Sequence, residues 1–327
     1  MALLSFLEAI REALRQEMRR DPDVWVVGED VGRKGGVFGV TQGLYEEFGE
    51  QRVQDSPLTE SAIVGVGIGA ALYGTRPVCE IQFADFIFPA FNQIISEAAK
   101  MRYRSNSDWS VPMVIRAPYG GGVRGGLYHS QSVEHYFTST PGLKVVVPST
   151  PYDAKGLLIS AIRDPDPVLF FEHKGLYRAV REEVPDEPYT VPIGKAAVRR
   201  EGSDITVISY GKTLHFCLEA AEELAREGYE ALVLDLRTLL PLDREAIVEA
   251  ARRTGKVLIV HEANKTHGIG AEVASIIAEE CLFDLDAPIR RLCGPDIPAM
   301  PFAAPMEQFY MLSPEKCLAA MRELAQF

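Results

Sequence analysis

The sequence has few cysteines, and none of them has the spacing of metal ligands or redox pairs. Its 327 residues include five cysteines, an odd number, and no Cys-x-x-Cys occurs. A disulfide framework and a structural zinc site are therefore not expected, and the cytoplasm fits best as a reducing compartment. The uncharged stretch 61–75 is glycine-rich and too short to span a bilayer. We expect no association with a membrane.

Basic residues are outnumbered by acidic ones. Lys and Arg together number 34 against 46 Asp and Glu, which gives a formal charge of −12. This balance argues against a nucleic acid or an anionic membrane as the main partner and leaves room for a basic protein partner. Hydrophobic residues make up 47% of the chain and charged residues 24%, a globular rather than disordered composition. The length predicts about two domains.

The N-terminus lacks the pattern of a targeting peptide, because Glu8, Glu12 and Glu17 interrupt it. Apolar residues recur there at helical spacing, at Leu3, Leu7, Ile10, Leu14 and Met18. Ser5 and Glu8 have the spacing of a capping box. We expect an amphipathic helix that belongs to the mature protein.

The rest of the chain alternates short apolar runs with helical patterns, which predicts parallel sheets covered by helices on both faces. In the first half we expect strands at 24–28, 77–82, 113–116, 144–148 and 168–172, with helices at 60–73, 88–102 and 152–162. In the second half we expect strands at 205–210, 231–236, 256–261 and 289–293, with helices at 214–227, 243–253, 271–281 and 314–326. The acidic segment 181–192 contains three prolines and indicates a linker. We therefore predict two α/β domains, at 1–180 and 201–327, joined by a linker at 181–200.

Glu60 stands at the start of a helix pattern that is otherwise apolar and small. A carboxylate there either interacts with the helix N-terminus or is a buried acid, and a surface glutamate is the plainer alternative. Gly65, Gly67 and Ala70 fit a loose Gly-x-Gly-x-x-Ala, but a dinucleotide fingerprint requires these glycines in a turn directly after a strand. Gly65 and Gly69, four residues apart, favour the close approach of another helix instead.

A glycine-rich segment follows the expected strand 113–116. Five of the seven residues from Gly120 to Gly126 are glycine. At the carboxyl edge of an α/β sheet, such a loop is either flexible or brings its backbone close to a ligand. It lacks the Gly-Lys-Ser/Thr ending of a phosphate-binding loop. His129 lies next to it, either as a solvated histidine or as an active-site group.

Three other features also have a structural and a functional interpretation. The aromatic cluster Phe83–Phe91 either packs a core or holds a flat heterocycle. Asp164 and Asp166 end a helix pattern, where carboxylates and carbonyls either bind a cation or are simply solvated. His261 ends an expected strand, so it either packs inside the domain or reaches a cleft.

Seven short stretches of the sequence together resemble a known family. The sequence resembles the β subunit of the thiamine-diphosphate-dependent decarboxylating component of 2-oxo acid dehydrogenase complexes, over essentially the whole chain. The resemblance rests on seven stretches in the same order: Gly28-Glu-Asp-Val-Gly, Leu58-Thr-Glu, Glu80-Ile-Gln-Phe-Ala-Asp, Arg102-Tyr-Arg-Ser, His129-Ser-Gln-Ser, Pro148-Ser-Thr-Pro-Tyr-Asp-Ala-Lys-Gly and Asp235-Leu-Arg-Thr-Leu. The family fold is a transketolase-like pyrimidine-binding domain followed by a transketolase C-terminal-type domain.

The resemblance implies a shared active site. The family binds the diphosphate through Mg²⁺ with a Gly-Asp-Gly…Asn motif, which this sequence lacks. In the family that motif belongs to an α subunit, so we expect an α₂β₂ heterotetramer with thiamine diphosphate between the chains. The complex also contains a dihydrolipoyl acyltransferase core with its lipoyl domain. That core carries a small basic subunit-binding domain, which we expect to meet an acidic surface near the C-terminal carboxylate of Phe327.

The resemblance also assigns roles to residues of this chain. Glu60 matches the glutamate that hydrogen-bonds the aminopyrimidine nitrogen of the cofactor, where a carboxyl group shares a proton. Phe86 matches an aromatic position against the pyrimidine, and Leu58 and Gln82 are expected neighbours. His129 matches the active-site histidine, with proton delivery or charge stabilisation during acyl transfer to lipoamide as its role. A structural potassium ion is implied near Ala161, Asp164 and Asp166.

The sequence favours branched-chain 2-oxo acids as substrates, with pyruvate second and acetoin third. The stretches that start at Phe83 and His129 look closer to branched-chain members, whereas those that start at Pro148 and Ile159 also occur in pyruvate members. Two functions of other classes stay open. One is a dehydrogenase that itself binds NAD, against which the misplaced glycines argue. The other is a non-catalytic subunit that only assembles the complex.

Overall fold

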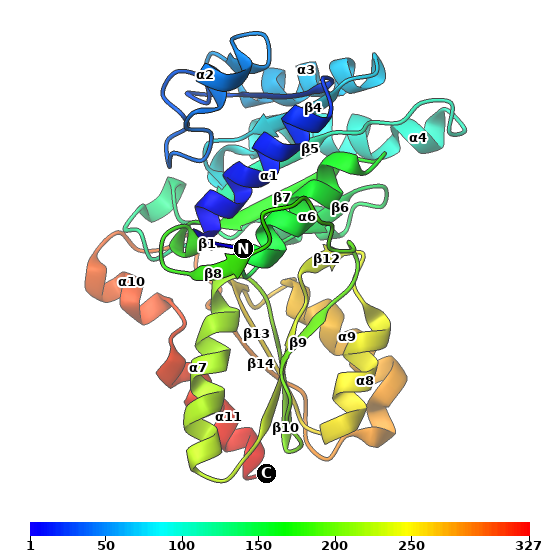
Figure 1. Cartoon of the computed structure of the whole chain (residues 1–327). Coiled ribbons are helices and arrows are strands. Elements are labelled where there is room, and N and C mark those ends of the chain that lie inside the picture. The colour runs from blue at the N-terminus through cyan, green and yellow to red at the C-terminus, as the bar shows by residue number, and fades with distance from the viewer. The chain divides into compact units, whose positions relative to one another are not determined.

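The computed structural model describes residues 1–327, and the chain forms two compact units (Figure 1). Unit 1 comprises residues 1–119 and 136–193, and unit 2 comprises residues 120–135 and 194–327. Each unit contains its own largely parallel sheet, so the predicted α/β class is confirmed. No helix in either unit combines the length and the apolar character needed to cross a bilayer.

The sheet of unit 1 has the parallel strand order β6-β7-β5-β4-β2-β3. Its strands are β2 (Val24–Gly28), β3 (Val53–Asp55), β4 (Arg76–Glu80), β5 (Val114–Tyr119), β6 (Lys144–Val146) and β7 (Val168–His173). The five strands predicted for this half are present, with ends that differ by a few residues. Among the strands of this sheet only β3 was not predicted, because its three residues include a single apolar one, Val53.

Helices cover both faces of this sheet. They are α1 (Phe6–Arg20), α2 (Leu44–Phe48), α3 (Glu60–Leu72), α4 (Met101–Arg104), α5 (His135–Thr138) and α6 (Pro151–Arg163). α1 and α6 pack against each other, and α3 packs against β4. The apolar stripe of α1 is fully buried at Phe6, Ile10 and Leu14, and each such side chain contributes roughly 1.5–3 kcal/mol. The burial of this stripe fixes α1 on the sheet.

The start of α1 confirms one detail of the sequence analysis and corrects another. Ser5 Oγ accepts a hydrogen bond from the Glu8 amide at 3.3 Å, and the Glu8 carboxylate accepts one from the Ser5 amide at 2.7 Å, which is the predicted capping box. Leu3, however, precedes the helix and is 61% exposed. It lies in β1 (Ala2–Ser5), which pairs antiparallel with β8 (Arg181–Val184). This pairing holds residues 2–5 extended, so the helical spacing of Leu3 is coincidental.

The helix predicted at 88–102 is also different in the structure. The backbone turns there as a 3₁₀ turn (Phe88–Ala90), a π-helical turn (Gln93–Glu97), a second 3₁₀ turn (Ala98–Lys100) and then α4. The amide of Ala98 donates to the carbonyl of Gln93, five residues back. Such a π turn accommodates one extra residue per turn, so the apolar side chains drift around the axis. A helical pattern therefore predicts the presence of this segment and not its hydrogen bonding.

Unit 2 has a second sheet, with the order β14-β13-β10-β11-β9. Its strands are β9 (Ala197–Arg200), β10 (Ile205–Ser209), β11 (Ala231–Asp235), β13 (Val257–Asn264) and β14 (Arg290–Gly294), and β12 (Thr238–Leu240) is a short strand outside this sheet. Its helices are α7 (Lys212–Arg226), α8 (Arg244–Thr254), α9 (Ile269–Cys281), α10 (Ala304–Tyr310) and α11 (Pro314–Ala325). The four strands and four helices predicted here are present. β9 pairs antiparallel with β11, and it lies with β8 inside the predicted linker 181–200.

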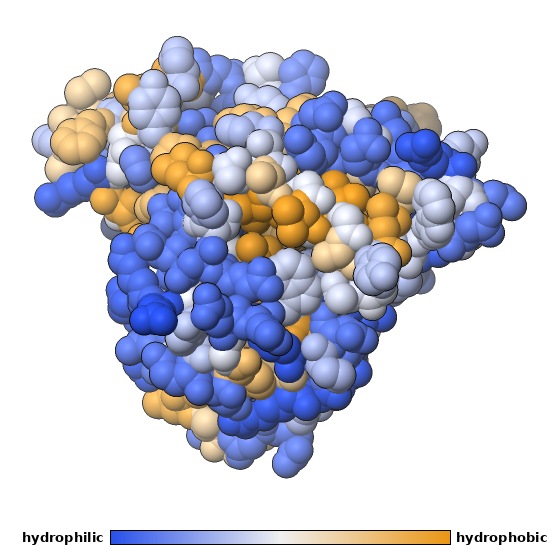
Figure 2. Space-filling model, turned by 90° about the horizontal axis from the view of Figure 1, so that it is seen from above, coloured by the Kyte–Doolittle hydropathy of each residue, from blue (hydrophilic) through white to orange (hydrophobic).

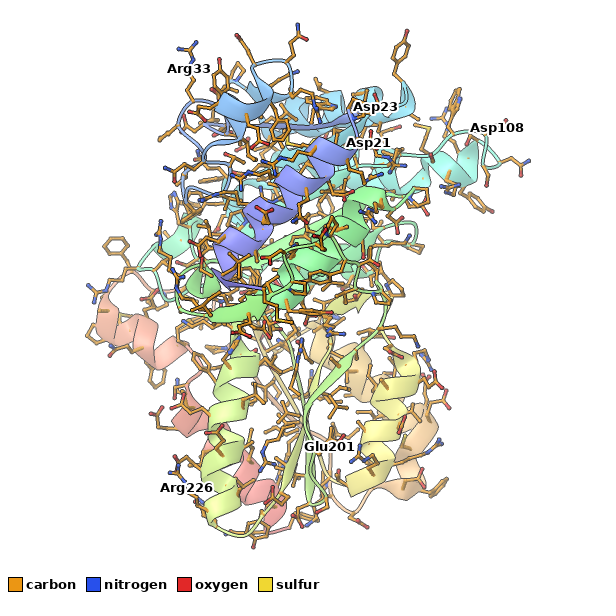
Figure 3. All side chains as sticks on the ribbon, viewed as in Figure 1. Asp21, Asp23, Arg33, Asp108, Glu201 and Arg226 are labelled. Atoms are coloured by element: carbon orange, nitrogen blue, oxygen red, sulfur yellow. The ribbon has the colours of Figure 1, made fainter.

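Charged side chains lie at the periphery of both units. Figure 3 labels Asp21 and Asp23, which lie between α1 and β2, and Arg33, which lies in the loop after β2. In unit 2 the side chains of Glu201 and Arg226 are 71% and 70% exposed, although each has an ion-pair partner. Exposed pairs of this kind contribute at most about 1 kcal/mol. The apolar cores, rather than surface ion pairs, therefore determine how each unit folds.

Candidate functional site

Acidic and amide side chains follow three neighbouring strands of unit 1, at the carboxyl edge of the sheet. Glu29 follows β2 directly, Gln82 follows β4, and Glu60 lies five residues after β3. The strands β4, β2 and β3 are adjacent and parallel, so their carboxyl ends meet at one edge. Ligands of open α/β sheets bind at such an edge. This edge is the candidate site in unit 1.

Glu60 is the first residue of α3 and is only 7% exposed. Glu29 lies close enough to interact electrostatically with this carboxylate. Burial raises the pKa of Glu29, and the charges of Glu60 and Asp30 raise it further. Three acidic side chains, Glu29, Asp30 and Glu60, therefore lie close together at this edge, and the pKa of Glu29 is raised by its surroundings. Glu29 was not predicted as a site residue, although its position directly after a strand was a usable signal.

The other predicted cofactor neighbours lie along the same edge. Gln82 Nε2 donates to Asp30 Oδ2 at 3.4 Å, which joins Gln82 to the acidic corner. Phe86 is half-buried in a 3₁₀ turn, with its ring edge-on to Phe83 at 6.0 Å between centroids. Leu58 is 79% exposed although it is apolar. Gln82 thus meets the acidic residues, Phe86 belongs to an aromatic cluster, and the side chain of Leu58 is left open to solvent.

A buried ion network supports this edge from within the sheet. Arg116, in the middle of β5, has no exposed surface. Its guanidinium contacts Glu80 Oε2 on β4 at 2.6 Å and Glu172 Oε1 on β7 at 2.6 Å. Tyr177 completes the network by donating its hydroxyl to Glu172 Oε2 at 2.7 Å. The network joins the neighbouring strands β4, β5 and β7. Glu80 lies two residues before Gln82, and Arg116 lies four residues before Gly120.

The glycine-rich segment and His129 belong to unit 2, although their sequence lies within the predicted domain 1–180. His129 is half-buried and follows a 3₁₀ turn (Gly126–Tyr128). The structure therefore places Glu60, Leu58, Gln82 and Phe86 in one unit and His129 in the other. Three carboxylates of unit 2 lie in or against residues 120–135, namely Glu134, Glu262 and Glu307, and none of them was predicted as a site residue.

Glu134 lies eight residues after Gly126 and is completely buried. The hydroxyl of Tyr210 donates to Glu134 Oε1 at 2.7 Å, and Glu134 Oε2 has no hydrogen-bond partner. Burial raises the pKa of Glu134 to about 7, helped by the charge of Glu262. His261, stacked on Tyr210, is also buried, and burial lowers its pKa to about 4. His261 is thus a neutral core histidine that accepts a hydrogen bond from the Gly270 amide at 3.2 Å.

The carboxylates predicted near a potassium ion already have cationic partners. Asp164 Oδ1 and Oδ2 lie 2.6 and 2.7 Å from Lys144 Nζ, and Arg102 pairs with Asp166. The carbonyl of Ala161 accepts the Asp164 amide at 3.3 Å. No group of three or more His, Cys, Asp or Glu side chains in residues 1–327 is arranged to hold a metal ion. A potassium ion here would need carbonyl ligands, and it stays a prediction.

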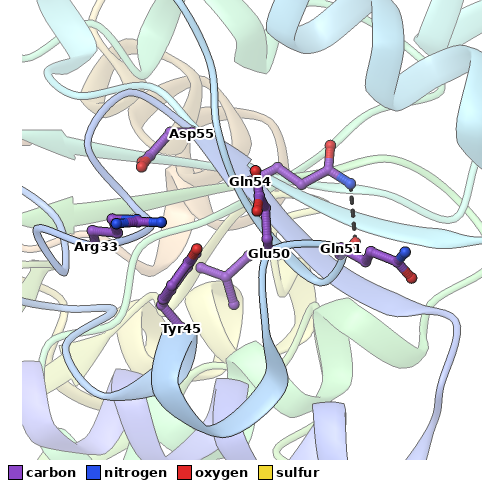
Figure 4. Close-up of a pocket in the computed structure, with 7 residues that line it drawn as sticks. Arg33, Tyr45, Glu50, Gln51, Gln54 and Asp55 are labelled. Atoms are coloured by element: carbon purple, nitrogen blue, oxygen red, sulfur yellow. Dashed lines mark hydrogen bonds between the residues drawn. The ribbon is translucent and has the colours of Figure 1, made fainter.

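A separate hollow of about 490 Å³ lies near the end of β3 (Figure 4). In Figure 4 Arg33, Tyr45 and Asp55 surround it, and Gln54 donates to the carbonyl of Gln51. Only Val53 among its lining residues is buried. An open hollow lined by solvated side chains gives little electrostatic control over a reaction. The acidic edge is therefore the stronger candidate for chemistry.

Comparison with known proteins identifies the family. The models for the transketolase pyrimidine binding domain and the transketolase C-terminal domain match residues 3–180 and 194–317. The 2-oxoisovalerate dehydrogenase subunit beta of Bacillus subtilis (strain 168) is 66% identical over the full length of both chains. This chain belongs to the family of 2-oxo acid dehydrogenase β subunits. The resemblance predicted from the seven stretches is confirmed.

Other relatives of this β subunit match over essentially the whole chain. The pyruvate dehydrogenase E1 component subunit beta of the same Bacillus strain is 47% identical over both full chains. The mitochondrial 2-oxoisovalerate dehydrogenase subunit beta 2 of Arabidopsis thaliana is 49% identical over 99% of this chain and 90% of that protein. A solved structure titled split gene transketolase, inactive beta4 tetramer, superposes with a TM-score of 0.81 at 24% identity and covers 99% of each chain. That structure supports the fold alone. The chain is a subunit of an oxidoreductase from a thiamine-diphosphate-dependent family.

Proposed function

We propose that this chain is the β subunit of an α₂β₂ enzyme that decarboxylates branched-chain 2-oxo acids and transfers the acyl group to lipoyl groups. The buried Glu60 at the carboxyl edge of the unit 1 sheet carries the proposal. The chain is 66% identical to the 2-oxoisovalerate dehydrogenase β subunit of Bacillus subtilis and 47% identical to the pyruvate dehydrogenase β subunit of that organism. This difference supports branched-chain 2-oxo acids over pyruvate as substrates. Pyruvate is the second candidate and acetoin the third.

The residues of the acidic edge fit the pyrimidine half of thiamine diphosphate. When bound, the cofactor supplies the electron-accepting ring that decarboxylation of a 2-oxo acid requires. Glu60 would hold a proton at the aminopyrimidine nitrogen, and its low exposure of 7% keeps water from competing for that proton. The half-buried ring of Phe86 would lie against the pyrimidine, with Leu58 and Gln82 beside it. Glu29 and Asp30 add two further carboxyl groups to this edge, and burial raises the pKa of Glu29.

The surface of unit 1 supports the proposal of a partner chain. The outward side of α3 carries Gly65, Val66 and Gly69, and Val66 is 56% exposed. A Cβ atom built on either glycine meets no atom of this chain within 4 Å, so the helix that we expected to approach there is not part of it. Figure 2, which views the face carrying α2 and α3 in Figure 1, shows apolar residues gathered across its middle. An α subunit covering this face would also contribute the ligands for Mg²⁺ and the diphosphate.

Two further elements of the proposal concern unit 2. His129 would deliver a proton or stabilise charge while the acyl group passes to the lipoyl domain. The acyltransferase core would bind near the C-terminal carboxylate of Phe327, whose residue is 66% exposed, with an affinity that falls as salt increases. A potassium ion near Ala161 and a cytoplasmic location complete the proposal. The five free cysteines support such a reducing compartment.

Reconstitution tests the proposed function. The β chain alone should show no decarboxylation of 3-methyl-2-oxobutanoate, whereas addition of its α chain, thiamine diphosphate and Mg²⁺ should restore it. The ratio of kcat/KM for this substrate and for pyruvate decides between the substrate classes. Decarboxylation by the β chain alone would overturn the shared active site. NADH binding by the isolated chain would favour the dehydrogenase alternative, and an α chain that is fully active without this chain would favour the assembly role.

A further inference from the structure

The glycine-rich segment of unit 2 is held by two buried carboxylates. Glu262 Oε1 accepts the amide of Gly121 at 2.7 Å and the hydroxyl of Ser132 at 3.0 Å. Gly121 and Ser132 lie at opposite ends of the loop that contains His129. A single oxygen atom therefore closes this loop, and the hydrogen bond from the Gly120 amide to the Gln131 carbonyl, at 3.0 Å, reinforces the closure.

The second carboxylate holds the turn inside the loop. Glu307 Oε1, on α10, accepts the amide of Gly122 at 3.1 Å and that of Arg124 at 3.0 Å. Gly122 and Arg124 both have positive φ, at +82° and +57°. Amides of a turn that point to one spot form a concave anion site, and here the chain fills that site with its own carboxylate. The amide groups that could have received a phosphate are thus occupied.

Both carboxylates are themselves buried. Glu262 and Glu307 are 4% and 6% exposed, so their bonds to the amides lie largely outside water. Hydrogen bonds are electrostatically stronger in such surroundings than in water, and the bond from the Gly121 amide to Glu262 is the shortest of the four, at 2.7 Å. The loop also packs tightly against the segment that leads into α10, because a Cβ atom on Gly121 would lie 2.2 Å from Met300 Sδ. The loop consequently has a defined conformation despite its glycines.

We propose that Glu262 and Glu307 are positioning residues, which hold the glycine-rich loop so that His129 keeps one place during acyl transfer. The role of His129 rests on the proposed function, whereas the fixation of the loop does not. Flexible glycines allow the sharp turns, and the two carboxylates remove the freedom that the glycines would otherwise give to the histidine. The substrates and the acyl group need not touch either carboxylate.

The test compares truncation with conservative replacement in the full-length chain. Glu262→Ala and Glu307→Ala remove the acceptors, whereas Glu262→Gln and Glu307→Gln keep an amide oxygen in the same place. Glu272→Ala, at an exposed glutamate on α9, is the matched control. Hydrogen exchange of the amides at 120–132 should quicken at least tenfold in the two Ala variants and stay within about threefold of wild type in the Gln variants and the control. Unchanged exchange in α7 and β10 shows that unit 2 is still folded.

Two further readouts concern His129. Its imidazole NMR resonance, assigned by its loss in His129→Ala, should shift or broaden in the Ala variants and not in the Gln variants. In the enzyme reconstituted with its α chain, reductive acylation should fall at least tenfold in kcat, with less than a threefold change in KM for the lipoyl domain and in decarboxylation. Loop exchange at the wild-type rate would overturn the proposal even if the enzyme acts as proposed. Faster exchange with an unmoved His129 resonance would also overturn it. A wild-type enzyme that fails to acylate lipoyl groups refutes the proposed function and leaves the exchange and NMR results to decide the fixation of the loop.

Discussion

Arg116 and Glu172 form a bidentate ion pair in the centre of the unit 1 sheet. Arg116 Nε and Nη2 lie 2.6 and 2.8 Å from the two carboxylate oxygens of Glu172, and neither side chain is exposed. Glu80 supplies a second carboxylate at 2.6 Å. Burial raises the pKa of Glu80, and the charge of Arg116 opposes this rise. The arrangement depends on the single cation at its centre.

Replacement of that cation should destabilise unit 1 strongly. Arg116→Met leaves two buried carboxylates beside each other without a counter-charge, and removal of one partner of a buried pair typically costs about 3–5 kcal/mol. Chemical denaturation, followed for wild type and variant, measures the loss. Arg226→Met, which breaks an exposed pair with Glu223 on α7, is the matched control and should cost less than about 1 kcal/mol. An equal loss of unfolding free energy in the two variants would show that the buried network stabilises the chain no more than an exposed ion pair does.

Glu134 should make the stability of unit 2 fall as the pH rises. Its pKa is about 7 in the folded chain, against 4.5 for a glutamate exposed to water as in the unfolded chain, so between these values the unfolded chain releases a proton that the folded chain keeps. The stability contribution is complete below pH 4.5 and is lost as the pH rises through 7, by about 3 kcal/mol in total. Glu134→Gln, which resembles the protonated acid and still accepts from Tyr210, should remove this loss.

Denaturation at pH 5 and at pH 8 measures the effect. Relative to wild type, Glu134→Gln should be markedly more stable at pH 8 and nearly equal at pH 5. The exposed Glu245, whose side chain is 86% exposed, gives the control Glu245→Gln, which should show no such difference between the two pH values. A constant stability difference between Glu134→Gln and wild type at both values would mean that Glu134 does not titrate in this range.

The general architecture could be predicted because it depends on local patterns. Buried parallel strands are short apolar runs. The helix α1 could be predicted from its stripe of apolar residues and from its capping box. β1 and β8 could not be predicted in the same way, since each forms an edge pair whose hydrogen bonds depend on a partner about 180 residues away. A local pattern contains no information about such a partner. Leu3 was accordingly assigned to the wrong element.

The candidate site was predictable only where one element carries it. Glu60 stood out because a carboxylate begins an apolar helix. Glu262 and Glu307 did not stand out, because each acts on amides that lie 141 and 185 residues away in the sequence. The assignment of residues 120–135 to unit 2 has the same origin, since those long-range hydrogen bonds join the segment to unit 2. Tertiary contacts, and not composition, determine where His129 lies.

Glu60→Gln tests the acid of the candidate site. Glutamine keeps the shape of glutamate and cannot give a proton as a carboxylic acid does. Thiamine diphosphate should still bind to the reconstituted enzyme, while exchange of the thiazolium C–H proton should slow by about 10²-fold or more, or roughly 3 kcal/mol. Exchange of this proton for deuterium in D₂O, stopped by rapid quenching after set times, measures this rate. Glu97→Gln, at a side chain that is 47% exposed, should exchange as wild type does. A wild-type rate in Glu60→Gln would remove Glu60 from the chemistry.

His129→Ala should separate the two halves of the proposed reaction. The substitution removes an imidazole from unit 2 and leaves the acidic edge of unit 1 unchanged. Release of CO₂, followed with an artificial electron acceptor, should therefore persist. Acylation of a separate lipoyl domain should fall by about 10²- to 10⁴-fold, which is the usual cost of losing a general acid. His267→Asn is the control, since His267 is exposed and its positive φ of 55° suits asparagine. If both rates fall equally in His129→Ala, the histidine acts at or before decarboxylation. If neither falls, His129 is a solvated loop residue with no part in catalysis.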